Sequence, residues 1–231
     1  MNKPYVTAAV LAAGLGSRLS LEQTKQKIDL LGKSIVRRAV EIFDKSLLVD
    51  DIIVVVRQEE EDFIKNELSG IRKPHKLVIG GDFRAQSAKN AFLALNPEAE
   101  FIAIHDAARC ITDLSDIENV IKDAFLYGAA SASREVIDTV KEIDGGFIRL
   151  TLSRDALRFV ETPQVFSREI YKKALDAAGE LDASITDDNM LVEKIGARVF
   201  LTKMQKENIK ITTKSDVSYA EFLLKGRLSD E

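Results

Sequence analysis

The chain has 231 residues, of which 45% are hydrophobic and 30% charged, and 33 Lys and Arg against 37 Asp and Glu give a formal net charge of −4. These fractions are those of an ordinary globular protein and exclude collagen-like, low-complexity and disordered chains. A charge so close to zero, without a basic block, argues against general binding to nucleic acids or to anionic membranes.

Five short apolar runs predict buried strands, and amphipathic helices separate them. The runs are rich in β-branched residues, as in strands that are covered on both faces. They span Val6–Leu11, Ile52–Val56, Lys76–Ile79, Phe101–Ile104 and Ala129–Ser133. The first helix follows Ser34, a suitable N-cap. This alternation predicts an α/β fold with a Rossmann-like, doubly wound and mostly parallel sheet.

The alternation stops after about residue 135, where a β-hairpin is predicted instead. Val136–Val140 and Phe147–Leu152 flank the segment 142–146, in which Asp-Gly-Gly is a strong turn signal. A hairpin has little room in a parallel sheet, so we expect a protruding arm at about residues 136–160. An isolated two-stranded ribbon is marginally stable in water, so the arm should pack against something, most commonly a two-fold partner.

The rest of the chain predicts further helices and strands within the same single domain, residues 1–231. We expect helices at Ser167–Ala178 and Asp187–Ile195, strands near Val199–Thr202 and Asn208–Thr212, and a last helix from Ser215 to about Leu224. There is one cysteine, no signal-peptide pattern and no run of about 20 apolar residues that would span a bilayer. We therefore expect a cytoplasmic protein.

A glycine loop at the end of the first strand is the first candidate ligand site. Gly14 and Gly16 allow a ligand to approach the backbone at the carboxyl end of the strand, where such sheets bind ligands. The spacing fits neither the dinucleotide motif nor the Lys-containing phosphate loop. Arg18 and Lys25 follow, and two cations beside a glycine turn suit a polyphosphate. The alternative is a tight turn with two solvated cations.

Two more motifs follow strands. In Gly80-Gly81-Asp82-Phe83-Arg84-Ala85-Gln86-Ser87, the glycines permit a sharp turn, and Asp82 or Ser87 can bind the polar edge of a ligand. The alternative is an ordinary strand–helix turn capped by Asp82. In His105-Asp106-Ala107-Ala108-Arg109-Cys110, the Asp106 carboxylate is well placed for Mg²⁺ shared with ligand phosphates.

Several other polar residues have ordinary structural explanations. We expect His105 to be a semi-buried histidine with its hydrogen bonds satisfied, Cys110 to be a packing residue and His75 to lie on the surface. These assignments leave no histidine for a Ser/His/Asp hydrolase. Thr186 would serve as a helix N-cap, and Lys210 as a charge on an edge strand.

The order of the motifs carries more information than any one of them. Along the chain they read LAAGLGSRL with TKQ close behind, GGDFRAQS, HDAAR, IDTVK, LSRD, TPQVF, ITDD and NIKIT. This series resembles the 2-C-methyl-D-erythritol 4-phosphate cytidylyltransferases of the non-mevalonate isoprenoid pathway, over roughly residues 6 to 220. The resemblance implies transfer of a cytidylyl group from CTP to a polyol phosphate with release of pyrophosphate.

The resemblance also assigns residues to roles. Nucleotide-binding positions would be Leu11, Ala12, Ala13, Gly14, Gly16, Gly81, Asp82, Ser87 and Ala107, and the cations that stabilise the pentavalent α-phosphate would be Arg18 and Lys25. Substrate-binding positions would be Asp106, Arg109, Thr139, Arg154, Thr186 and Lys210; among them Arg154 and Lys210 aim the phosphate oxygen. Asp106 would hold Mg²⁺, with Glu207 as a weaker candidate for a second carboxylate. The arm would exchange across a homodimer, so that Thr139 and Arg154 serve the partner's site.

Elementary chemistry agrees with this assignment. Phosphoryl-type transfer needs in-line positioning and neutralisation of charge rather than covalent participation by the protein. The nucleophile is already a phosphate oxyanion, so no strong base is needed. The chain departs from common family residues at Leu19, at Thr24 and Cys110, which replace prolines, and at 203–205, where relatives often have Gly and Asp.

Three alternative functions stay open. A cytidylyltransferase for another polyol phosphate, such as ribitol 5-phosphate, would share the nucleotide half of the site. A sugar-1-phosphate nucleotidyltransferase that uses UTP or dTTP would share the glycine loop, but such chains are usually longer and lack the TPQ and ITDD motifs. An inactive nucleotide-binding regulator would have no need for the set Arg18, Lys25, Asp106, Arg154 and Lys210.

Overall fold

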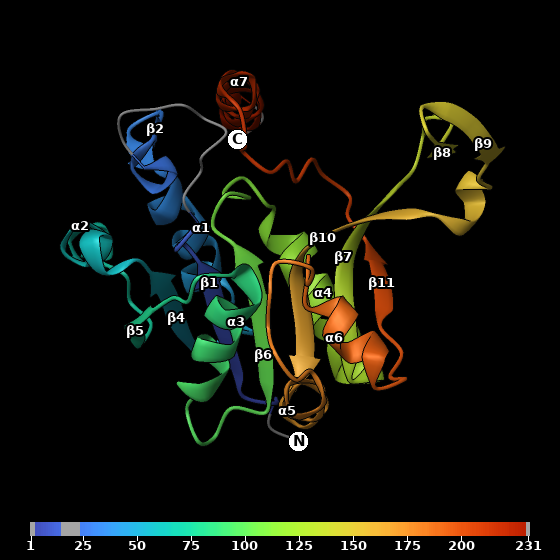
Figure 1. Ribbon diagram of the computed structural model, residues 1–231. Coiled ribbons are helices and arrows are strands. Elements are labelled where there is room, and N and C mark those ends of the chain that lie inside the picture. Colours follow the sequence, from blue (N-terminus) through green and yellow to red (C-terminus); the bar gives the residue numbers. More distant parts are fainter. Residues whose placement is uncertain (1–2, 15–23, 230–231) are drawn as a thin grey trace.

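A seven-stranded sheet forms the centre of the computed structural model, which describes residues 3–14 and 24–229 (Figure 1). Its strands are β1 (Val6–Leu11), β4 (Asp51–Val56), β5 (His75–Ile79), β6 (Phe101–Asp106), β7 (Ala129–Glu135), β10 (Arg158–Ser167) and β11 (Phe200–Lys203). They lie in the order β11-β7-β10-β6-β1-β4-β5. β10 is antiparallel to both neighbours, and every other pairing in this sheet is parallel. The predicted doubly wound, mostly parallel sheet is confirmed.

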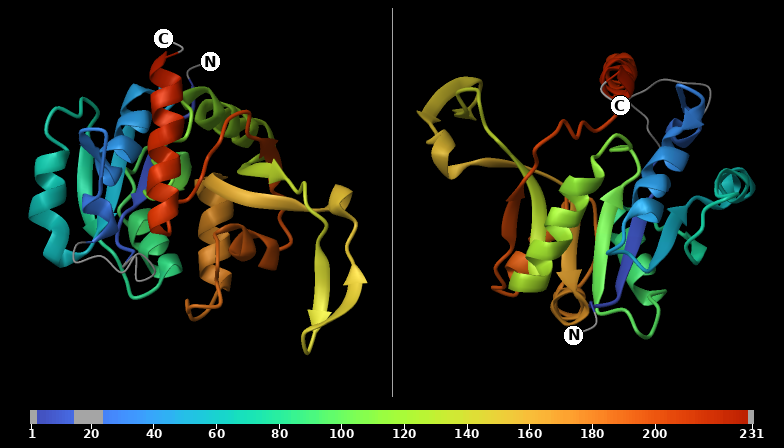
Figure 2. Two further views of the ribbon diagram at one scale, coloured as in Figure 1. Left: turned by 90° about the horizontal axis from the view of Figure 1, so that it is seen from above. Right: turned by 180° about the vertical axis from the view of Figure 1, so that it is seen from behind.

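Helices cover both faces of the sheet (Figures 1 and 2). They are α1 (Ile35–Lys45), α2 (Glu61–Glu67), α3 (Arg84–Leu93), α4 (Leu114–Tyr127), α5 (Arg168–Ala177), α6 (Asn189–Lys194) and α7 (Lys214–Ser229), with 3-10 turns η2 (Lys25–Lys27), η3 (Gln58–Glu60) and η4 (Arg154–Ala156). Within the described residues, none of these helices has the length and apolar character that crossing a bilayer requires.

Strand β1 is mostly apolar because both of its faces are buried. Along β1, Val6, Ala8 and Val10 pack into one core with residues of α1 and α4. Ala9 and Leu11 point to the opposite face and pack with residues of α3, α5 and α6. This period of two over a fully buried strand is the arrangement that parallel sheets with helices on both sides require.

The predicted arm is present, and its second strand lies where it was expected, but its first strand is shifted along the chain. β8 (Lys141–Asp144) and β9 (Phe147–Thr151) form a ribbon that projects away from the sheet (Figures 1 and 2). The expected strand at 136–140 is therefore wrong. Asp144 pairs with Phe147, so the turn is only Gly145 and Gly146, with φ values of 52° and 85°. A two-residue turn with two positive φ angles favours glycine at both positions, which explains the register.

In the second half of the chain, one strand was missed and one expected strand is wrong. β10 was not predicted, although it lies between β6 and β7 in the sheet. The expected strand at 208–212 does not form; this segment instead crosses the carboxyl edge of the sheet, where the Ile211 N–H donates to the carbonyl of Ala108. Lys210 is therefore not an edge-strand charge.

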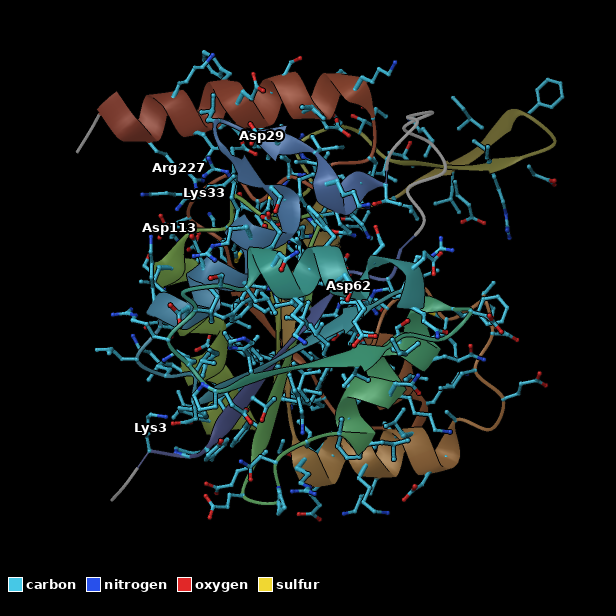
Figure 3. The ribbon with its side chains drawn as sticks, turned by 90° about the vertical axis from the view of Figure 1, so that its left-hand side faces the viewer. Lys3, Asp29, Lys33, Asp62, Asp113 and Arg227 are labelled. Carbon is cyan, nitrogen blue, oxygen red and sulfur yellow. The ribbon has the colours of Figure 1, made fainter. Side chains whose placement is uncertain are left out.

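The helix ends follow local capping. The Ser34 hydroxyl accepts from a backbone N–H group of α1, as predicted, and the Ser167 hydroxyl likewise accepts from one of α5. α6 is shorter than expected and begins at Asn189, so Thr186 is not its N-cap. α7 extends beyond the expected end and lies over a small ribbon that was not predicted, β2 (Asp29–Leu30) with β3 (Lys33–Ser34) (Figure 3).

Candidate active site at the carboxyl edge of the sheet

A cavity of about 260 Å³ lies where β1 and β6 end and α3 begins. The loops around the cavity continue the hydrogen bonding of the sheet. The Ala12 N–H donates to the carbonyl of Val55, and the Ala107 N–H donates to the carbonyl of Leu11. The cavity is lined by Leu11, Ala13, Gly14, Lys25, Gln26, Gly81, Asp82, Phe83, Arg84, Ser87, Asp106, Ala108, Lys210 and Thr212. It therefore occupies the edge of the sheet at which doubly wound folds bind ligands.

Asp106, the last residue of β6, is the centre of the charged groups in this cavity. Lys210 Nζ lies 2.6 Å from its Oδ2, and Arg84 Nε lies 3.1 Å from its Oδ1. The backbone N–H of Asp106 donates to the Thr162 hydroxyl at 3.1 Å. Cations from α3 and the 208–212 segment thus meet at the Asp106 carboxylate, while Thr162 of β10 contacts the backbone of the same residue.

The electrostatics keep Asp106 ionised. Burial by itself would raise the pKa of this carboxyl, but the charges of Arg84 and Lys210 outweigh burial and hold the pKa well below its ordinary value. Asp188 and Asp106 likewise outweigh burial at the Arg84 guanidinium and raise its pKa. The cavity therefore presents a fixed carboxylate beside fixed cations, which suits a ligand that carries phosphates and a divalent cation.

The GGDFRAQS motif forms a tight turn between β5 and α3. The Gly81 N–H donates to Ser87 Oγ at 3.2 Å, and Gln86 Oε1 accepts from the N–H groups of Asp82 and Phe83. The N-cap of α3 is therefore Phe83 and not Asp82, and Gln86 folds back onto the preceding turn, which leaves the exposed Asp82 carboxylate at the cavity wall.

Gly80 in this turn has no room for a side chain. A Cβ would lie 2.6 Å from Ala13 Cβ and 2.8 Å from Ser87 Oγ. We expect Gly80→Ala to lower the free energy of unfolding by about 1–3 kcal/mol, the usual cost of forcing an extra methyl into a packed site. Urea denaturation measures the change.

Gly226→Ala is the matched control for that substitution. A Cβ at Gly226, inside α7, meets nothing within 4 Å, so alanine should leave the protein equally stable or slightly more stable. Equal stability of the Gly80→Ala and wild-type proteins would show that the glycine loop and α3 separate at little cost.

His105 and Cys110 have the structural roles that the sequence indicates. Burial lowers the pKa of His105 to about 4, so the ring is neutral at pH 7. Its Nδ1 lies 3.1 Å from the Thr162 hydroxyl and its Nε2 3.2 Å from the carbonyl of Arg109. Burial raises the pKa of the Cys110 thiol to about 12, which keeps it protonated and unreactive. His75 is exposed.

Arg109 lies beside the cavity without lining it. Its Nη1 donates to the carbonyl of Asn208 at 2.6 Å and lies 3.8 Å from Glu161 Oε1. Glu161 also pairs with Arg134, at 3.3 Å. Asn208 in turn donates to the carbonyl of Thr162. Arg109 therefore fastens the segment that carries Lys210 against β10.

Thr24, where the resemblance leads us to expect a proline, keeps a backbone that proline would adopt. Its φ is −68°, close to the value that a proline ring imposes. Its hydroxyl donates to the buried carboxyl group of Glu60 in η3. A hydrogen bond to the last residue of η3 thus anchors the turn that carries Lys25.

The cavity brings together most of the predicted residues but not all of them. Leu11, Ala13, Gly14, Lys25, Gly81, Asp82, Ser87, Asp106 and Lys210 line it, whereas Ala12 and Ala107 are buried behind it. Thr139 and Arg154 lie in the arm segment, and Thr186 is exposed before α6; none of the three lines the cavity. Glu207 lines a separate groove beside α7. Gly16 and Arg18 lie outside the described residues.

Sequence reasoning missed five residues of the cavity wall: Gln26, Phe83, Arg84, Ala108 and Thr212. Arg84 is the most consequential of them because it pairs with Asp106 and, at 2.6 Å, with Asp188. The sequence shows Arg84 as the cation inside the GGDFRAQS motif. It does not show that the Arg84 side chain points toward the end of β6, because that depends on how the helix packs.

Comparisons with known proteins agree over nearly the whole chain. Residues 6–226 match the model of the family described as 2-C-methyl-D-erythritol 4-phosphate cytidylyltransferase. A protein of that name from Pelotomaculum thermopropionicum is 39% identical, with 96% of this chain and 95% of that protein aligned. One from Clostridium acetobutylicum is 38% identical over 94% of this chain and 96% of that protein. The crystal structure of 4-diphosphocytidyl-2C-methyl-D-erythritol synthase from Anaerococcus prevotii has a TM-score of 0.85 at 26% identity, and the match covers 96% of this chain and 99% of that one.

Proposed function

Because the chain belongs to the 2-C-methyl-D-erythritol 4-phosphate cytidylyltransferase family, we propose that it joins CTP and 2-C-methyl-D-erythritol 4-phosphate. The products are 4-diphosphocytidyl-2-C-methyl-D-erythritol, an isoprenoid precursor, and pyrophosphate. A phosphate oxygen of the polyol phosphate attacks the α-phosphorus of CTP, a new P–O–P bond forms, and the bond from the α-phosphorus to the bridging oxygen breaks. That oxygen leaves on pyrophosphate.

The observation that carries this proposal is the meeting of Lys25, Lys210 and Asp106 in one cavity next to the glycine loop. The reaction brings together a triphosphate and a phosphate monoester, so its main obstacle is repulsion between anions. Fixed cations placed before the reaction lower this cost without reorganising. In this proposal Lys25 stabilises charge on the α-phosphate, and Lys210 holds the attacking phosphate in line with it.

Magnesium is part of the proposal, with Asp106 as its ligand. The described residues contain no cluster of three or more His, Cys, Asp or Glu side chains suited to a metal. A single carboxylate nevertheless fits this ion, because Mg²⁺ is usually held by one or two carboxylates together with substrate phosphates and water. Asp106 is ionised and lines the cavity. When bound, the ion would neutralise charge on the triphosphate.

A homodimer formed through the arm at about residues 136–160 is also proposed. Ile143, Phe147 and Ile148 in the arm are 67%, 81% and 67% exposed in the single chain. Three large apolar side chains on a ribbon without a core favour burial against another copy. Arg154 and Thr139 would then reach the partner's cavity. We place the enzyme in the cytoplasm, a reducing compartment that suits its one buried free cysteine, Cys110.

A screen of pyrophosphate release tests the proposal. Each of the four common NTPs is paired with 2-C-methyl-D-erythritol 4-phosphate, ribitol 5-phosphate and glycerol 3-phosphate, with Mg²⁺ present. We expect kcat/KM for CTP with 2-C-methyl-D-erythritol 4-phosphate to exceed that of UTP by about 100-fold or more. The reason is that a pocket built to pair with the cytosine amine leaves buried groups unpaired when uracil binds.

The same screen includes the control reactions. Wells with EDTA should release no pyrophosphate, and full activity there would exclude the magnesium part of the proposal. Equal use of CTP and UTP would contradict cytidine specificity. Faster reaction with ribitol 5-phosphate would replace the proposed acceptor while leaving the nucleotide half of the assignment in place.

A further inference from the structure

A continuous series of polar contacts leads from the cavity to a carboxylate that the cavity does not reach. Lys210 contacts Asp106, Asp106 contacts Arg84, and Arg84 Nη1 lies 2.6 Å from Asp188 Oδ2. The hydroxyl of Tyr171 donates to the other oxygen of Asp188 at 2.5 Å. The series therefore joins the 208–212 segment, β6, α3, the start of α6 and α5.

Asp188 has no access to a ligand. Its side chain is 0% exposed, and it does not line the cavity. Its backbone N–H donates to Gln164 Oε1 at 2.9 Å, which fixes it against β10. Tyr171 is also fully buried and packs on Phe166 and Phe92. Both residues are thus rigidly held, and in the described part of the chain the ion pair of Asp188 is with Arg84.

The shape of the Arg84 guanidinium explains why it needs the second carboxylate, that of Asp188. The guanidinium is a planar fork whose separate N–H groups can each face a different acceptor. Here Nε faces Asp106 and Nη1 faces Asp188, while the buried Nη2 has no hydrogen-bond partner. Two anchors on different atoms fix the rotation of the fork. With only Asp106 as an anchor, the fork would turn about that one contact.

We propose that Asp188 is a positioning residue, held by Tyr171, which acts through Arg84 and Asp106 to place the Lys210 ammonium for the transfer. This inference rests on the proposed function of the cavity. Asp188 fixes Arg84, Arg84 fixes one oxygen of Asp106, and the other oxygen sets where Lys210 Nζ lies. Misplacement of a reacting group by about 1 Å, caused by a change far from the chemistry, can cost about 100-fold in rate.

A double-mutant cycle tests this route. Asp188→Asn keeps the size of the side chain and removes its charge. We expect it to lower kcat by about 10- to 100-fold in the wild-type background. In the Lys210→Ala background the same change should lower kcat by less than about 3-fold, because there is no lysine left to misplace. Equal factors in both backgrounds would overturn the proposal, since a general loss of structure lowers both activities alike.

Two further variants serve as a control and as a substitute in this double-mutant cycle. Asp176→Asn, which removes an exposed carboxylate from α5, should leave kcat within about 2-fold, and it controls for net charge. If Asp188→Asn does not fold, Tyr171→Phe takes its place in the cycle, with a smaller loss but the same dependence on Lys210. Tyr171→Phe at wild-type kcat would overturn the proposal. An inactive wild-type enzyme in this assay would refute the proposed function itself, which is a separate result.

Discussion

Replacing Lys25 with alanine is expected to lower kcat by about 10²- to 10³-fold while changing the Kd for CTP much less. Lys25 begins η2 and lines the cavity close to the end of β1. If its ammonium faces charge that grows on the α-phosphate, its contribution is larger in the transition state than in the bound ground state. Such an interaction raises kcat rather than affinity.

Steady-state kinetics with saturating acceptor, together with calorimetric binding of CTP, separates these effects. Lys27→Ala is the matched control, because Lys27 lies in the same turn, faces the ring of Phe63 at 5.2 Å and does not line the cavity. It should retain nearly full kcat. A Lys25→Ala enzyme with wild-type kcat and only a raised KM would make Lys25 a ground-state binding contact.

Refolding two inactive variants together is expected to restore activity. Arg154 lies at the base of the arm, where its Nη1 donates to the carbonyl of Ile137, and it does not line the cavity of its own chain. If it serves the partner's cavity, a heterodimer of Arg154→Ala and Lys25→Ala has one site with both defects and one site with neither. About half of its sites should then work, whereas each homodimer stays inactive.

This experiment requires that heterodimers form. Purification through two different affinity tags, one on each variant, isolates them. Arg149→Ala mixed with Lys25→Ala is the control for the arm, because Arg149 pairs with Glu142 on the ribbon and has no proposed role in the site. Purified heterodimers of the Arg154 and Lys25 variants without activity would place Arg154 in its own chain's site, since each site would then keep one defect.

The parallel half of the sheet was predictable because its signals are local. β1 and β4 are short, mostly apolar runs between turn residues, and such runs are typical of strands buried on both faces. The arm was also predictable, because an Asp-Gly-Gly turn is strong by itself. Its register was not, since the ribbon is exposed and no buried face selects which residues pair.

β10 was not predictable from local pattern. Pro163 lies in its middle, and proline within a run argues against a central strand. Glu161, Thr162 and Gln164 beside it are buried polar residues whose partners come from distant segments, such as Arg109 and Asp187. Only the packed sheet supplies these partners.

The same limit applies to the site. The motifs indicate Lys25, Asp106 and Lys210, and the structure places the three in one cavity. Arg84 and Asp188 also lie in motifs, GGDFRAQS and ITDD, but their importance lies in facing each other across 104 positions of sequence. A motif indicates residue types at a loop; it does not indicate which two loops meet.

The placement of β10 also affects how the chain is made. β6 ends at residue 106 and β7 at residue 135, yet the position between them is filled only by residues 158–167, after the arm has been synthesised. Until then the facing edges of β6 and β7 have no strand between them, and open strand edges are templates for wrong pairing. Pairings across long sequence separations also form slowly. During synthesis on the ribosome, these two facing edges therefore stay open to wrong pairing until residue 167 has been made.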